Sequence, residues 1–584
     1  YRALRKPAPE GAEALLTTIE REIEAAVKSF AFTDPSAAAP ALARALAATR
    51  AASKQLGSDA DVRFMLDLKE QQIAEALHAA LGVSLTAMAQ PAGMPDATGR
   101  PGRGPAAMAP VVPGQVFEVH TTFISSGRFE IRSSGAFGLT SRDGWGTGTG
   151  AAVTSIPSNQ PQTGTFTVTV PDDASLTRPH FSRGSIRDTR YTVTDQQSRY
   201  RPSAEAALEA TFGYIVNGVP LEIRRPVTRL EANLPYGHNT RVLAVVPALS
   251  VTISPAHAVA RLDPPSKGIT LKVEVLNNRE GPSAGELTLR VPPGWKATPA
   301  SRPFQFSRAG ERELYAFDVS MPLLADREYR IEAVASSAGR EYREGYTTIR
   351  HRDLETRYLY RDAVTSVRGI DVNIAPGLKV GYVMGIGDDV PSGLEQLGVD
   401  VQLLDEQDLA TADLAGFHAI MTGTRAYAVR EDLKTYNRRL LDYVKEGGNL
   451  IVLYNTQELV PALYAPYPAE LPGNAEEVSE EDSPVEILAP AAPVLTRPNR
   501  ITMADFDGWV EQRGSKFWTT WDPQYTPIIA TWDQGQQPQK GGWLHARYGK
   551  GHYTYFAYAF HRQLPYGVPG AYRLLANLLS LKPQ

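Results

Sequence analysis

The chain has 584 residues, of which 42% are hydrophobic and 21% are charged, and its formal net charge is -4. This is ordinary globular composition, and the length suggests roughly three to five domains. The charge balance excludes the basic footprint of a nucleic-acid-binding protein. The absence of cysteine excludes disulfides, cysteine-ligated zinc and a cysteine nucleophile, and no apolar run approaches the ~20 residues that span a bilayer.

Residues 1–90 are predicted to form a helical bundle. In the first helix, apolar residues recur at helical spacing, at Leu16, Ile19, Ile23 and Val27. Asp34-Pro35 is a typical start of a second helix, and Ser58 and Asp61 have the spacing of a capping box for a third. We expect one apolar side on that third helix, made of Phe64, Leu68 and Ile73.

Residues 91–110 are dense in proline and glycine and are predicted to be a linker. The chain begins at Tyr1 without a methionine or an apolar leader segment, which is typical of a processed or truncated start. A protein that is secreted, periplasmic or on the cell surface is the expected setting.

Two β modules are predicted next, a β-sandwich over 111–243 and an immunoglobulin-like β-sandwich over 244–352. Their runs alternate between apolar and polar residues with a period of two, as in 117–123, 166–170 and 269–275. Glycine and proline separate these short runs, which is typical of all-β sandwiches.

Residues 353–584 are predicted to form a doubly wound α/β domain, with an insertion near 459–500. Strands are expected at LKVGYVMG, VDVQLL, FHAIMTG and NLIVLY, with a helix over 430–446 between the last two. Strands that alternate with helices favour a parallel sheet. The predicted fold class is therefore multidomain α+β.

Several phrases resemble those of large bacterial PIG-L-type sugar deacetylases. VPGQVFEVHTTF at 112–123 resembles the entry to their first β module. Four further segments resemble their C-terminal α/β domain, and the last of them is the most specific: VGYVMGIGDDVPSGLEQLGVDVQLL, MTGTRAYAVREDL, ITMADFDGWVEQRG and RQLPYGVPGAYRLLANLLSL. The resemblance covers nearly the whole chain. It implies a sandwich of the kind that accompanies carbohydrate-active enzymes and a degenerate domain similar to class I glutamine amidotransferases.

The catalytic chemistry of that family does not carry over to this chain. PIG-L-type enzymes hold zinc with a His-Pro-Asp-Asp motif and a distant histidine. This chain has no His-Pro pair, and Pro171-Asp172-Asp173 follows Val170. The resemblance therefore implies a non-catalytic C-terminal region with no metal ligands of its own. Zinc is expected only in a missing deacetylase domain, which would be an upstream segment or a partner subunit.

Polar residues are expected to converge at the carboxyl ends of the parallel strands, where open α/β sheets bind ligands. The candidates for such a pocket are Asp388, Arg425, Tyr427, Asn455 and His561. The alternative for Arg425 is a structural ion pair with Asp505 or Asp507.

Glutaminase chemistry is not expected at this edge. It needs a cysteine on a strand-to-helix elbow and a His-x-Glu pair, but Tyr454-Asn455-Thr456 follows the strand where the cysteine would stand. His561-Arg562-Gln563 lacks the acid. Gly385-Ile386-Gly387 also lacks the third glycine of a dinucleotide fingerprint, at Val390, and is interpreted as a tight turn.

Aromatic residues are concentrated after position 500, and they suit either sugar contact or packing. The candidates for glycan contact are Trp518, Trp521 and Trp543. The histidines at 545, 552 and 561 lack a carboxylate at ligand spacing, so no metal site is predicted.

The leading hypothesis is a scaffold and accessory region that holds a deacetylase domain, with glycan binding and homo-oligomer formation as further expectations. The first alternative is a small-molecule enzyme or binding protein that uses the α/β cleft. An enzyme would show a perturbed histidine or carboxylate there, whereas a scaffold would show the cleft filled by aromatic rings. The second alternative is a cell-surface assembly protein with apolar patches on its sandwiches.

Overall fold

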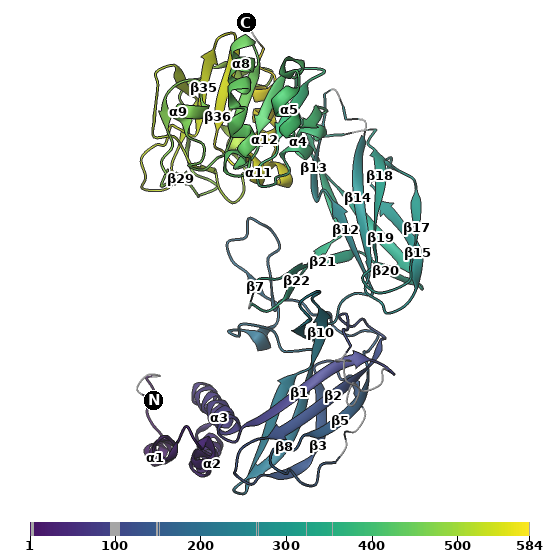
Figure 1. Cartoon of the computed structure of the whole chain (residues 1–584), viewed down its shortest axis with the longest axis vertical. Helices are drawn as coiled ribbons and strands as arrows, with labels where there is room; N and C mark the ends of the chain where they lie inside the picture. The colour runs from purple at the N-terminus through teal and green to yellow at the C-terminus, as the bar shows by residue number, and fades with distance from the viewer. Residues whose placement is uncertain are drawn as a thin grey trace.

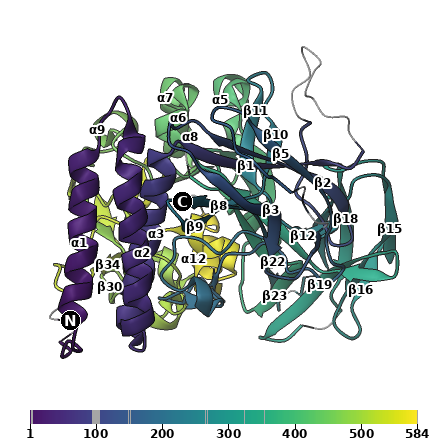
Figure 2. The ribbon, with the colours of Figure 1, turned by 90° about the horizontal axis from the view of Figure 1, so that it is seen from below.

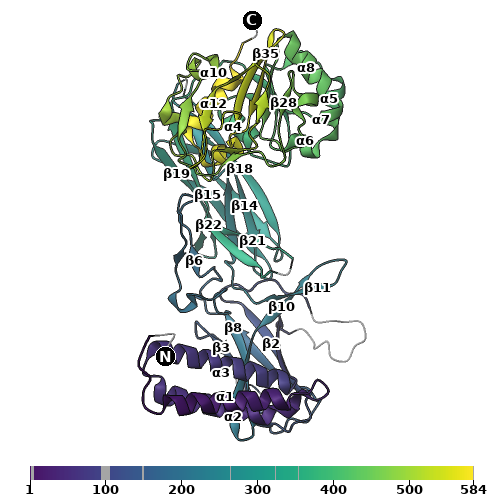
Figure 3. The same ribbon diagram turned by 90° about the vertical axis from the view of Figure 1, so that its left-hand side faces the viewer.

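The protein is an elongated, multidomain α+β molecule (Figure 1). The computed structural model describes residues 1, 5–93, 106–147, 150, 152–263, 265–266, 268–322, 324–352 and 354–582. A helical layer and a first β module lie at one end, a second β module lies in the middle, and a domain with a mostly parallel sheet lies at the other end (Figures 1 and 3). No helix in the described parts of the chain is both long and apolar enough to cross a membrane.

Three helices lie side by side at the N-terminal end (Figure 2). They are α1 (Ala12–Ser29), α2 (Ala39–Leu56) and α3 (Ala60–Ala80). The residue that caps α3 is Asp59 and not Ser58, because the Asp59 carboxylate accepts the backbone N–H groups of Asp61 and Val62 at 3.0 and 3.3 Å. Lys6 donates to the same carboxylate at 2.8 Å and so ties the start of the chain to this cap.

The predicted apolar side of α3 is only partly correct. Ile73 is buried, but Phe64 and Leu68 are 67% and 41% exposed. The buried stripe of the helix consists instead of Val62, Leu66, Ile73 and Leu77. These residues also recur at helical spacing. Packing against α2 and the sheet determines which of the two apolar stripes is buried.

The helical prediction extended too far, because α3 ends at Ala80 and residues 83–91 form strand β1. Gly82 has a positive φ of 57°, and a Cβ there would lie 2.3 Å from the Ser126 hydroxyl, so the turn requires glycine. The burial of β1 alternates from Val83 onward, which identifies a strand with one face in the core.

The first β module has two main sheets, with strand orders β11-β10-β1-β2-β5-β4 and β3-β8-β9, and a small third sheet of β6 (Phe181–Ser182) and β7 (Thr192–Val193). The strands of the main sheets are β1 (Val83–Pro91), β2 (Val116–Ser125), β3 (Arg132–Ser141), β4 (Gly146–Thr147), β5 (Gln162–Thr169), β8 (Leu208–Val216), β9 (Val219–Pro226), β10 (Thr228–Ala232) and β11 (His238–Val242). One hydrophobic cluster includes side chains from both main sheets and from the three helices. The helical layer is therefore packed onto this module.

Most of the predicted linker, residues 94–105, lies outside the described residues. From Met108 onward the chain is part of the first β module, because Met108 is 3% exposed and its N–H donates to Leu230 O at 2.8 Å.

The second β module also has two sheets around one hydrophobic cluster. Its strands are β12 (Leu249–Ser254), β13 (His257–Arg261), β14 (Gly268–Asn277), β15 (Ser283–Arg290), β16 (Lys296–Thr298), β17 (Ser301–Phe306), β18 (Arg312–Ser320), β19 (Glu328–Ser337), β20 (Arg340–Tyr342) and β23 (Val364–Ile370). The strand predicted over 269–275 is confirmed, with Leu271, Val273 and Val275 fully buried. The module continues past the predicted boundary at 352, because β23 pairs with β13 and β19.

A hairpin of strands β21 (Glu344–Ile349) and β22 (Arg357–Asp362) lies between the two β modules (Figure 1). Arg178 of the first module pairs with Glu344 at 2.5 Å and lies 4.1 Å above the ring of Tyr360. Arg350, which follows β21, pairs with Glu231 of the first module at 2.9 Å. The contact between the modules therefore combines partly exposed ion pairs, which are screened by salt, with a hydrophobic cluster that includes Val112, Val246 and Tyr358.

We expect Arg178→Gln to loosen this contact and leave the fold intact. Because the pair is partly exposed, the change should cost less than about 1 kcal/mol of stability. Amide hydrogen exchange in β21 and β22 should rise several-fold, and raising the salt concentration should have a similar effect on the wild type. Arg201→Gln is the matched control, since Arg201 pairs with Glu205 within one module; equal exchange in both variants would contradict this role of Arg178.

The C-terminal domain has a seven-stranded sheet in the order β25-β24-β26-β27-β36-β35-β33. The strands are β24 (Lys379–Val383), β25 (Asp400–Leu403), β26 (Ala419–Thr422), β27 (Asn449–Leu453), β33 (Tyr525–Pro527), β35 (Trp543–Tyr548) and β36 (Gly551–Phe556). Neighbouring strands from β25 to β36 pair in parallel, whereas β35 and β33 run antiparallel. The predicted parallel strand pairing is thus confirmed for all four predicted strands.

The helices of this domain are short apart from two. They are α4 (Val390–Gln396), α5 (Glu406–Thr411), α6 (Ala426–Val429), α7 (Glu431–Thr435), α8 (Asn437–Glu446), α9 (Pro461–Tyr464), α10 (Pro493–Thr496), α11 (Phe560–Gln563) and α12 (Pro569–Leu579). The single helix predicted over 430–446 is divided into α7 and α8 at Tyr436, and it ends at Gly447 as expected. The predicted insertion contains only short strands and helical turns between β27 and β33.

Candidate functional site

The carboxyl ends of β24, β26, β27 and β36 bring the segments after these strands together. The backbone N–H of Thr424 donates to Asp388 Oδ2 at 3.0 Å, which joins the first two segments. The N–H of Arg425 donates to Tyr454 O at 2.8 Å, and the rings of Tyr454 and His561 stack with centroids 5.8 Å apart. The sequence-predicted pocket residues therefore do lie at one edge of the sheet.

Asp388 is fully engaged in fixing this edge. Its carboxylate accepts hydrogen bonds from the Tyr382 hydroxyl at 2.7 Å, from Val390 N at 3.2 Å and from Thr424 N. A carboxylate with three donors is well suited to holding two loops in register and poorly placed to serve as a general base.

Tyr427 and Asn455 are interior residues that support the same turn. Both are fully buried. Asn455 Oδ1 accepts the N–H of Tyr427 at 3.0 Å, and the Tyr427 hydroxyl donates to Asn437 at 2.7 Å. Burial raises the pKa of the Tyr427 hydroxyl, which therefore stays protonated. These two side chains position the loops and do not face a ligand.

Arg425 stands on the strand-to-helix elbow between β26 and α6, in a left-handed conformation with φ 54° and ψ 32°. The structural ion pair considered for it is absent, because Asp505 pairs with Arg573 at 2.7 Å. No described residue forms a hydrogen bond or an ion pair with the Arg425 guanidinium, and its Nε is buried without a partner. Arg425 is thus a partly buried cation that the described residues leave unpaired.

His561 is a neutral side chain at neutral pH. Burial lowers the pKa of His561 to about 4, with a further decrease from Arg562 and opposing contributions from Asp388 and Glu511. Its neighbour Gln563 is fully buried and is bound to the backbone of Val510 through both ends of its amide. In this segment the His561 ring is therefore partly exposed, whereas the Gln563 amide is buried and supports the backbone.

Some residues of this edge were not identified from the sequence. Thr424, Glu458 and Arg562 all follow strands or lie in the loops that the strands lead into. The Thr424 hydroxyl and the Arg562 Nε are buried without hydrogen-bond partners. A systematic list of polar residues within a few positions of each strand end would have included them.

The tryptophans proposed for glycan contact are mostly core residues. Trp518 and Trp543 are 2% and 0% exposed. Trp518 stacks on Tyr555 with centroids 4.6 Å apart, and Trp543 lies against Phe556 at 5.2 Å. Their faces are covered by other aromatic rings, and only Trp521 is partly exposed.

His545 and His552 lie side by side on the paired strands β35 and β36, with His545 Nε2 and His552 Nδ1 3.2 Å apart. His561 lies apart from them, after the carboxyl end of β36. Within the described ranges, no group of three or more histidine or acidic side chains is placed to hold a metal ion.

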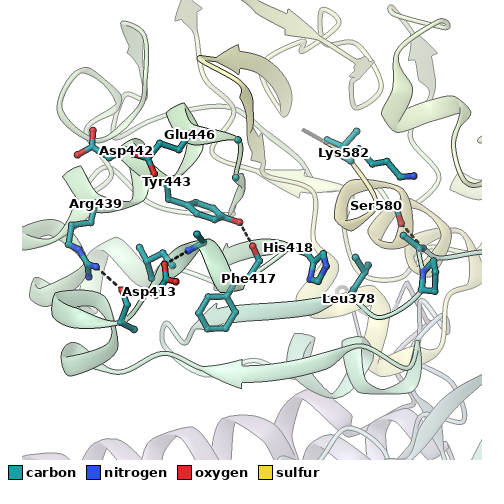
Figure 4. Close-up of a pocket in the computed structure, with 18 residues that line it drawn as sticks. Leu378, Asp413, Phe417, His418, Arg439, Asp442, Tyr443, Glu446, Ser580 and Lys582 are labelled. Atoms are coloured by element: carbon teal, nitrogen blue, oxygen red, sulfur yellow. Dashed lines mark hydrogen bonds between the residues drawn. The ribbon is translucent and has the colours of Figure 1, made fainter. Parts of the chain in front are cut away.

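A cavity of about 760 Å³ opens at the opposite, amino-terminal edge of the parallel strands (Figure 4). Its polar groups are largely engaged by the protein itself: Arg439 donates to Ala412 O at 2.7 Å, and the Tyr443 hydroxyl donates to Phe417 O at 3.1 Å. His418 Nδ1 accepts the N–H of Lys379 at 3.0 Å. Glu446 and Lys582 also line this cavity, and neither forms an ion pair with a described residue.

Comparison with known proteins gives no family for this chain. No protein-family model and no curated protein matches it. A cold-adapted β-galactosidase from Rahnella sp. R3 has 16% identity and a TM-score of 0.23 over 35% of this chain and 31% of that chain. Escherichia coli alpha-2-macroglobulin has 9% identity and a TM-score of 0.16 over 45% of this chain and 16% of its own.

The apo form of the Calx CBD1 domain has 6% identity and a TM-score of 0.14 over 21% of this chain and 98% of its own. The first of these matches spans less than a third of the β-galactosidase. These similarities give no relation to PIG-L-type deacetylases.

Proposed function

We propose that this chain is a non-catalytic scaffold and accessory region of a PIG-L-type sugar deacetylase. In this proposal the two β modules are a β-sandwich and an immunoglobulin-like sandwich, and the C-terminal domain is a doubly wound, degenerate relative of class I glutamine amidotransferases. Its partner is a zinc-bearing deacetylase domain or subunit, outside the cytoplasm of a bacterium. Glycan binding and homo-oligomer formation belong to the same proposal.

One observation carries the non-catalytic part of this proposal. Tyr454-Asn455-Thr456 stands after β27 where the cysteine nucleophile of a glutaminase would be, and the strand-to-helix elbow after β26 carries Arg425, whose guanidinium cannot attack a carbonyl group. The neighbouring His561 stacks on Tyr454 and has no described carboxylate as a hydrogen-bond partner. A scaffold predicts such an aromatic ring at this edge, whereas the lowered pKa of His561 is the feature expected of the alternative, an enzyme that uses this edge.

The decisive experiment combines a native-source preparation with an activity assay. We expect the chain incubated with Zn²⁺ and N-acetylglucosamine oligosaccharides to release no acetate above a protein-free control. In protein purified from its native source, intact mass and sequencing should find a His-Pro-Asp-Asp motif in the same polypeptide or in a stable partner. Acetate release by the chain alone, or native material without any such motif, would overturn the proposal.

A further inference from the structure

Arg425 adopts a backbone conformation that is unfavourable for its residue type. The left-handed region costs a residue other than glycine about 1–2 kcal/mol, and the φ of Arg425 is 54°. Hydrogen bonds on both sides maintain this geometry, from Arg425 N to Tyr454 O and from Tyr427 N to Asn455 Oδ1. Such strain persists where the surrounding structure enforces it and is concentrated at functional positions.

The side chain of Arg425 carries a second unfavourable feature. Its Nε is buried and makes no hydrogen bond to any described atom. A buried donor without a partner costs about 1–3 kcal/mol, and more when the group is charged. The Thr456 hydroxyl and, to a smaller extent, Arg425 contribute to lowering the pKa of Glu458. The Glu458 carboxylate, however, accepts a hydrogen bond from the Thr456 hydroxyl and forms no ion pair with Arg425. A glycine at this position would remove both costs.

Neutral groups at the same edge of the sheet could also contact a ligand. The Tyr454 and His561 rings are partly exposed and stack on each other, and the hydroxyl of Thr424, the residue before Arg425, is buried without a partner. Asp388 accepts three hydrogen bonds, and Arg562 pairs with Glu511. The polar atoms left for a ligand are therefore the Arg425 guanidinium and neighbouring groups that can donate hydrogen bonds.

We propose that the carboxyl edge of the parallel sheet, which also carries Tyr454 and His561, binds one small oxyanion, a carboxylate or a phosphate group, on the guanidinium of Arg425. The planar fork of arginine matches both kinds of oxyanion and binds them in pairs of parallel hydrogen bonds. The carboxylate of Glu458, whose pKa Arg425 helps to lower, disfavours polyphosphates near this guanidinium, so the ligand carries a single oxyanion. This site goes beyond the scaffold role and does not depend on it.

The test is isothermal titration calorimetry of the full chain with inorganic phosphate and, separately, with acetate, at constant ionic strength. We expect saturable binding of at least one ion, weakened at least about tenfold in Arg425→Gln. The ion that binds more tightly identifies the ligand as a phosphate or a carboxylate. Glu458→Gln should tighten binding, because it removes a negative charge near the guanidinium.

Two further variants separate binding from folding. Arg425→Gly removes the cation while suiting the left-handed backbone, so it should fold at least as well as the wild type and lose binding. Arg438→Gln is the matched control, because Arg438 is 84% exposed on α8 and pairs only with Asp442. Absence of saturable binding of both ions, or unchanged affinity in Arg425→Gln and Arg425→Gly, would overturn the proposal.

Discussion

Replacing Trp518 with alanine should destabilise the C-terminal domain by about 3–5 kcal/mol, as for other large buried aromatic residues. Trp518 is 2% exposed, and it lies between the ring of Tyr555, 4.6 Å away, and the edge-on ring of Tyr525 at 5.4 Å. These rings come from β36 and β33, so the cavity would open between strands of the same sheet. Urea denaturation, monitored by circular dichroism, measures this loss in the free energy of unfolding.

Trp521→Ala is the matched control for this prediction. Trp521 is partly exposed on the short strand β32 (Thr520–Trp521), and its removal should cost less than about 1 kcal/mol. The pair also separates packing from sugar contact. If Trp518→Ala kept its stability and lost affinity for a glycan, Trp518 would be a contact residue, and our assignment of this ring to the core would fail.

The fold could be predicted where a single pattern determines an element. The alternation in 269–275 has one apolar face, and the structure places Leu271, Val273 and Val275 in the core. On α3 two apolar stripes compete, and burial of Leu66 rather than Phe64 depends on packing between elements, which local spacing does not contain. The strand after Gly82 was missed because it directly follows a helix.

The position of the candidate site could be predicted, but the state of its residues could not. Strand ends converge for topological reasons, which is why Asp388, Arg425 and His561 lie at one edge. Whether a carboxylate is already engaged, as Asp388 is, depends on loop geometry. The position of a strand-to-helix elbow was considered at Tyr454-Asn455-Thr456, whereas the left-handed residue is found at Arg425, one strand earlier in the chain, and no residue type in the sequence marks it.

Acid should destabilise the C-terminal domain through its buried histidines. Burial lowers the pKa of His545 to about 3 from the ordinary 6.5, with further decreases from His552 and Arg547. Between these two pH values, His545 therefore binds a proton in the unfolded chain and not in the folded chain. The resulting stability is present above pH 6.5 and is lost as the pH falls through that window. Between about pH 8 and pH 5 the loss from His545 is about 2 kcal/mol.

His552 reinforces this effect, because burial also lowers its pKa and Arg547 lies 2.7 Å from its Nε2. In His545→Gln, the loss of stability between about pH 8 and pH 5 should be smaller than in the wild type by about 2 kcal/mol. Urea denaturation at both pH values measures this difference. His418→Gln, at an exposed ring in the same domain, is the control for replacing a histidine with glutamine. Equal pH profiles for wild type and His545→Gln would mean that His545 accepts its proton as readily in the folded chain as in the unfolded one.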